Sequence, residues 1–205
     1  MGVYYREIPG GLLSPEILTN GRNLICLQSN CVATKRHTGS IHDELYKALG
    51  FGDPYKIREA KHRNLAMESH RPQLGSFLIM RDKKEPYSKC GLAFLFAQYN
   101  MGDGNRLYFS DKEYEESCKR IEWKRDIKCV RLQAFKECLN GLLKSPLCGF
   151  DNIYFPDGIG CFRAGGHWPD YEAAIEKFSN ETTQRKKIFI VKKKNDAPQG
   201  MNARQ

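Results

Sequence analysis

Apolar strand-like runs alternate with helix-like segments in this chain, and that alternation constrains the fold more than any other feature. The run at 23–29 (NLICLQS) is apolar and continuous enough to be buried on both faces, and 90–99 (CGLAFLFAQY) is the most apolar stretch. Strands buried on both faces are typical of parallel sheets with helices on either side. The sequence therefore predicts a three-layer α/β/α fold with a mixed, mostly parallel central sheet.

The expected elements follow from the same patterns. Strands are predicted at 3–8, 23–29, 75–80, 90–99, 153–155 and 187–192. One helix is predicted from Ser40 to Gly50, with a capping-box-like start at Ser40 and Asp43, an apolar face at Ile41, Leu45, Ala48 and Leu49, and a position on its surface for His42. Further helices are predicted at 127–142 and 169–178. Residues 1–194 form one expected domain, with a surface excursion near 100–125 and a disordered tail at 195–205.

Composition limits the possible partners. The net charge of +9 favours an anionic partner, and no apolar run approaches the ~20 residues of a membrane span. Met1-Gly2 resembles a myristoylation start, but Arg6 stands where Ser or Thr is required, so we expect no anchor. The eight cysteines include no C-x-x-C pair, which favours reduced thiols and an intracellular, cytoplasmic or nuclear, protein. We expect no metal, no cofactor and a monomer.

The run FPDGIGCFRAGGHWPDY, residues 155–171, joins a strand to a helix through a glycine-rich loop. Glycines permit positive φ and close approach to a ligand, and Pro169 suits the first turn of a helix. Such a loop is a candidate anion site. The segment GIGCFR lacks the third glycine of a dinucleotide-binding fingerprint because Arg163 stands there, so a Rossmann interpretation is weak.

Three loops leave strand ends where ligands of α/β folds bind, namely 9–13, 29–40 and 157–166. We call them the first loop, the second loop and the glycine loop. If two of these loops aim backbone N–H groups at one crevice, that crevice would suit a diphosphate.

Five segments together resemble the macro-domain family. IYFPDGIGCFRAGGHWPDYEAAIEKF is similar to that family's strand, FP-x-x-IGCGLAGG-x-W loop and helix. RLQAFKECLNGLL, LQSNCVA, GSFLI and LFAQYNMG also fit, in the right order, over roughly residues 3–192. The likeness is to the branch that includes ADP-ribose-1''-phosphate phosphatases and related viral and cellular proteins.

The resemblance implies an ADP-ribose cleft. The first loop would contact adenine, the second loop the distal ribose, and the glycine loop the diphosphate. The implied ligand-binding residues are Gly10, Gly11, Leu12, Asn30, Cys31, Gly39, Ser40, Ile41, Gln98, Gly158, Ile159, Gly160, Cys161, Phe162, Arg163, Ala164, Gly165 and Gly166. A valine at Gly160 is expected to fill the diphosphate space without unfolding the protein.

The chain departs from the family at several functional positions. Gly11 replaces an acidic residue that holds adenine, and Ala33 replaces a second asparagine. Gln98 and Ala164 stand where the glycohydrolase branch has its lysine and aspartate. The candidate catalytic residues that remain are His37, as a general base, and Asp157, which could orient a water.

Three functions follow as hypotheses. The first is hydrolysis of an ADP-ribose derivative, either a phosphate ester such as ADP-ribose-1''-phosphate or a glycosidic ADP-ribosyl bond. The second is a non-catalytic module that reads or sequesters ADP-ribose, an ADP-ribosylated protein or another nucleotide signal. Nucleic-acid binding through the basic surface is the weaker alternative.

Overall fold

A computed structural model of the chain describes residues 2–102, 126–182 and 186–194. Its main sheet has six strands in the order β1-β8-β7-β2-β6-β5. Their bounds are β1 Val3–Pro9, β2 Asn23–Asn30, β5 Phe77–Met80, β6 Gly91–Gln98, β7 Asn152–Pro156 and β8 Lys187–Lys194. All neighbours are parallel except β5, which pairs antiparallel with β6.

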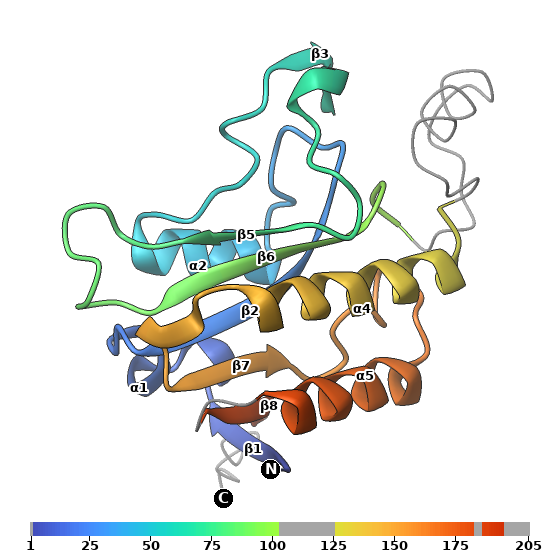
Figure 1. The fold of residues 1–205 in the computed structure, drawn as a ribbon. Helices are drawn as coiled ribbons and strands as arrows, with labels where there is room; N and C mark the ends of the chain where they lie inside the picture. The colour runs from blue at the N-terminus through green and yellow to red at the C-terminus, as the bar shows by residue number, and fades with distance from the viewer. Residues whose placement is uncertain (1, 103–125, 183–185, 195–205) are drawn as a thin grey trace, which may run out of the picture.

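Helices cover both faces of the sheet (Figure 1). On one face lie α4, Lys128–Lys144, and α5, Trp168–Glu181, which pack against each other. On the other face lie α1, Pro15–Leu18, and α2, Ile41–Leu49. This arrangement confirms the predicted three-layer α/β/α fold, and β2 and β6 are buried along almost their whole length as their apolar sequences require.

The start of α2 forms as its sequence predicts, because Ser40 Oγ accepts a hydrogen bond from the Asp43 amide at 3.3 Å. The predicted apolar face is wrong at Ala48, which is exposed. The buried positions include Leu45 and Leu49, and His42 lies three residues before Leu45.

Two regions were not assigned by the sequence patterns. Residues 11–18 form the 3-10 helix η1, Gly11–Leu13, followed by α1. Residues 51–74 contain a hairpin of β3, Ala60–His62, and β4, Leu65–Ala66, and the 3-10 helix η2, Glu68–His70. This hairpin stands out from the body of the protein (Figure 1). A further 3-10 helix, η3, spans Leu147–Gly149 before β7.

The predicted excursion lies almost wholly outside the described residues, and the predicted tail lies outside them altogether. Within the described residues, no helix is both long enough and apolar enough to cross a membrane.

Candidate functional site

A cleft of about 1030 Å³ runs along the carboxyl ends of the parallel strands. The first loop, the second loop and the glycine loop all contribute to its walls. Fifteen of the predicted ligand-binding residues line it, namely Gly10, Gly11, Leu12, Asn30, Gly39, Ser40, Ile41, Gln98 and residues 158–164, and so do the candidate catalytic residues His37 and Asp157. Three predicted residues do not: Cys31, whose side chain is fully buried in the core, and Gly165 and Gly166.

The glycine loop is shaped by its backbone. Gly158 and Gly160 have φ of 67° and 75°, values that favour glycine. The Ile159 amide donates to the Pro156 carbonyl at 3.1 Å, and the Cys161 amide donates to the Gly158 carbonyl at 2.9 Å. These tight turns bring backbone to the cleft surface with little side chain in the way.

The expectation for a valine at Gly160 is wrong. A Cβ at this position would lie 2.4 Å from Cε1 of Tyr171 and 2.6 Å from Oε1 of Gln28. Tyr171 is a fully buried residue of α5. A side chain at residue 160 would therefore disturb the packing of the loop on α5 before it reached any ligand.

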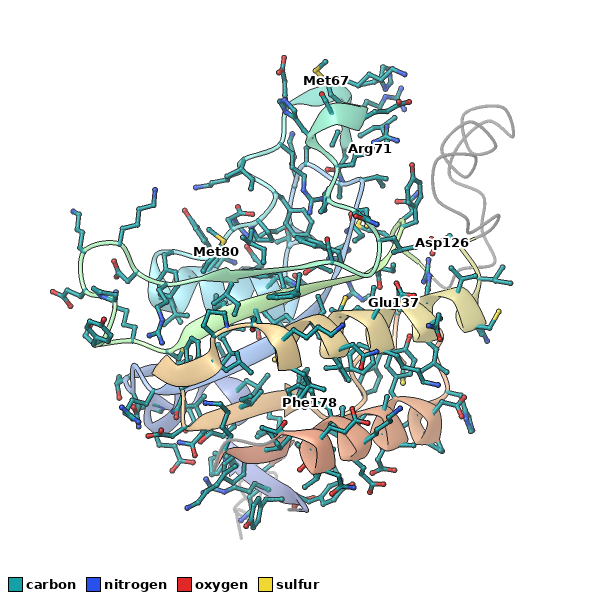
Figure 2. All side chains as sticks on the ribbon, viewed as in Figure 1. Met67, Arg71, Met80, Asp126, Glu137 and Phe178 are labelled. Atoms are coloured by element: carbon teal, nitrogen blue, oxygen red, sulfur yellow. The ribbon has the colours of Figure 1, made fainter. Side chains whose placement is uncertain are left out.

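A buried arginine fixes the far end of the glycine loop. Arg131 of α4 forms a two-point ion pair with Asp126, with N–O distances of 2.7 and 2.6 Å, and donates to the Ala164 carbonyl at 3.1 Å. Asp126 also accepts from the amides of Tyr99 and Asn100, at 3.1 and 2.9 Å. Figure 2 shows Asp126 where the chain enters α4, close to the end of β6. Sequence reasoning missed this anchor because Arg131 lies among apolar helix positions.

The second loop is held by buried side chains. Asn30 is 4 % exposed, and its Oδ1 accepts from the Ala33 amide at 2.7 Å. Its Nδ2 is 3.5 Å from the Tyr55 hydroxyl. Asn30 therefore shapes the loop with the amide group that was predicted to lie near a ribose.

Arg58 holds the second loop through hydrogen bonds to its backbone. Its Nη1 donates to the carbonyls of Asn30 at 3.0 Å and Ala33 at 2.7 Å, and its guanidinium lies against the rings of Tyr55 and Phe96. The hairpin is joined to the same loop, since Ala66 N donates to the Val32 carbonyl at 2.7 Å. The unassigned region 51–74 is thus a structural part of the site.

The expected surface position of His42 is wrong. Its ring stacks on Phe94 at 5.9 Å, shares a 2.9 Å hydrogen bond with Ser29 Oγ, and lines the cleft. Burial, together with the charge of Arg36, lowers the pKa of His42 to about 4. The site therefore holds a neutral imidazole at neutral pH. Its spacing from Leu45 and Leu49 was the signal that could have placed it on the buried face.

His37 and Arg163 meet across the cleft. His37 Nδ1 lies 2.8 Å from the Thr38 carbonyl oxygen and 2.9 Å from Nη1 of Arg163, and Nε2 is 3.2 Å from the same Nη1. Both side chains are exposed, as is Phe162 at 82 %. His37 and Asp157 line the same cleft but form no hydrogen bond or ion pair with each other. The two candidate catalytic residues therefore do not form a hydrogen-bonded catalytic pair.

Two further kinds of polar side chain line the cleft, namely the amides of Gln28 and Gln98 and the thiol of Cys161. Gln28 Nε2 donates to Gln98 Oε1 at 2.9 Å, which ties the ends of β2 and β6 together. Burial raises the pKa of Cys161 to about 11, so this thiol is protonated at neutral pH and is a poor nucleophile. Among the described residues, no group of three or more His, Cys, Asp or Glu side chains is placed to hold a metal ion.

Comparison with known proteins gives no assignment, since no family model and no curated protein matches this chain.

Proposed function

We propose that the protein is macro-domain-like and binds ADP-ribose, or a close ADP-ribose derivative, in the cleft at the strand ends. The observation that carries the proposal is that the second loop and the glycine loop face each other across one cavity of about 1030 Å³. The volume suits a nucleotide-sized ligand. In this pose the diphosphate lies on the backbone of residues 158–163, where positive-φ glycines allow close approach.

The charges of the cleft support a ligand with a diphosphate. The cations that line it are Lys35, Arg163, Lys192 and Lys193, and the carboxylates are Glu44 and Asp157. Arg163 lies at the tip of the glycine loop and forms no ion pair with another described residue. A guanidinium so placed can donate to phosphate oxygens.

Hydrolysis of ADP-ribose-1''-phosphate is the second candidate. It is favoured by two imidazoles at the second-loop end of the cleft, His37 and His42, where the distal ribose would lie. His37 is the exposed one, and in this reaction it would take a proton from the attacking water. The side-chain amide of Asn30 is already bonded to Ala33 and Tyr55, so it is not available to act on a ligand. This favours instead a module that binds ADP-ribose without turnover.

A calorimetry and thermal-shift panel tests the proposal. The ligands are ADP-ribose, ADP-ribose-1''-phosphate, AMP, NAD and a short single-stranded RNA. ADP-ribose binding should raise the melting temperature, because a ligand that binds only the native state stabilises it by mass action. Phosphate release from ADP-ribose-1''-phosphate separates the enzyme from the binding module. RNA binding that exceeds ADP-ribose binding and falls steeply with salt would instead support the nucleic-acid alternative.

A further inference from the structure

The first-loop end of the cleft carries lysines beside glycines. Lys192 and Lys193, near the end of β8, line the cleft next to Gly10 and Gly11 of the first loop. Cβ of Lys193 is 3.2 Å from the point where a Cβ on Gly11 would stand. The aliphatic stem of Lys193 therefore occupies the space into which a side chain at residue 11 would project.

The two lysines differ in their partners. Lys192 Nζ forms an exposed ion pair with Glu7 at 3.2 Å. The ammonium group of Lys193 is exposed and has no hydrogen bond or ion pair with the described residues. Asp157, another carboxylate of the cleft, is joined to β8 through its amide, which donates to the carbonyl of Val191 at 2.9 Å, and it forms no ion pair with either lysine.

We propose that this end of the cleft binds a phosphate on the adenosine half of the ligand, so that the preferred ligand is ADP-ribose phosphorylated on its adenine-side ribose. The proposal rests on the proposed function, with the diphosphate on the glycine loop and, as the macro-domain resemblance implies, adenosine at the first loop. An ammonium group on a flexible stem is a common phosphate ligand. Lys193 and the backbone of Gly10 and Gly11 line the same end of the cleft, and the stem of Lys193 packs on Gly11.

The test compares two ligands on three proteins by calorimetry. The ligands are ADP-ribose and ADP-ribose 2′-phosphate, and the proteins are the wild type, Lys193→Gln and Lys194→Gln. Lys194 is a matched control, because it is the next residue of β8 and is exposed but does not line the cleft. Neither exposed substitution is expected to disturb folding.

In the wild type the 2′-phosphate should improve affinity about tenfold at low ionic strength, as one charge-assisted contact supplies. Lys193→Gln should remove most of that gain and lower ADP-ribose affinity by a smaller factor, whereas Lys194→Gln should retain the gain. Equal or weaker binding of the 2′-phosphate by the wild type overturns this inference and leaves the proposed function intact. An equal loss in both variants also overturns it, since the gain would then come from diffuse surface charge. Failure of both ligands to bind would remove the proposed function, and this inference with it.

Discussion

The two walls of the cleft are built by different means. The glycine loop is formed by backbone turns at positive-φ glycines and by close packing on Tyr171. The second loop is formed by side chains, in which Asn30 bonds to Ala33 and Arg58 donates to the carbonyls of both. The comparison teaches that a substitution at Gly160 acts through backbone strain and packing, whereas one at Asn30 or Arg58 acts through loss of buried hydrogen bonds.

The largest difference between the walls should appear with alanine at two glycines of similar φ. Gly160→Ala combines positive-φ strain with a clash against Tyr171, so the free energy of unfolding should fall by about 2–5 kcal/mol. Gly39→Ala has φ of 70° but open space around its Cβ, so the loss should be only about 1–2 kcal/mol. Urea unfolding of both variants measures the two values. Equal losses would show that the packing on Tyr171 contributes nothing.

The second effect tests the half-buried imidazole of His42 in the second-loop wall. The pKa of His42 is about 4 in the folded state against 6.5 for an ordinary histidine, so protonation favours the unfolded chain. The stability contributed by the neutral ring is present above pH 6.5 and is lost as the pH falls toward 4. Wild type and His42→Gln should therefore differ most at pH 7, and the difference should shrink by about 3 kcal/mol at pH 4. A pH-independent difference in urea unfolding would mean that the folded ring titrates normally.

These two cases also show what the sequence can and cannot predict. The sheet could be predicted from apolar runs such as 90–99. The glycine loop could be predicted because several glycines in a short segment indicate backbone with positive φ. The second-loop wall could not be predicted, because Arg58 meets Asn30 and Ala33 across 28 and 25 residues of chain. Which buried polar groups pair depends on how the whole chain folds, and no local pattern encodes it.

A third, smaller effect comes from the hydrogen bond within the second loop. Asn30→Ala leaves the buried Ala33 amide without its acceptor and should lower the free energy of unfolding by about 1–3 kcal/mol. ADP-ribose affinity should fall with it, because the loop that faces the distal ribose loses its shape. Asn20→Ala is the control, since Asn20 accepts from the Arg22 amide at an exposed turn away from the cleft. Similar losses in both variants would contradict a special role for the buried amide.

The smallest effect concerns the exposed rim of the glycine loop. Arg163→Gln should leave stability within about 0.5 kcal/mol of the wild type, because its side chain is exposed and forms no ion pair. ADP-ribose affinity should fall about two- to fivefold, and less at high salt, as expected for an exposed charge–phosphate contact. Calorimetry at two salt concentrations measures this. A loss of ADP-ribose affinity that does not depend on salt would mean that Arg163 contributes through packing against the ligand and not through its charge.

The most direct test of the central claim is an amide NMR titration of the ¹⁵N-labelled protein with ADP-ribose. We predict that the largest shift changes fall on the amides of residues 158–163 and 37–41, the two loops that face each other across the cleft. Amides of the β3–β4 hairpin should change little, because this hairpin does not line the cleft. Saturating ADP-ribose that leaves residues 158–163 unshifted, or that shifts the hairpin instead, would contradict the account.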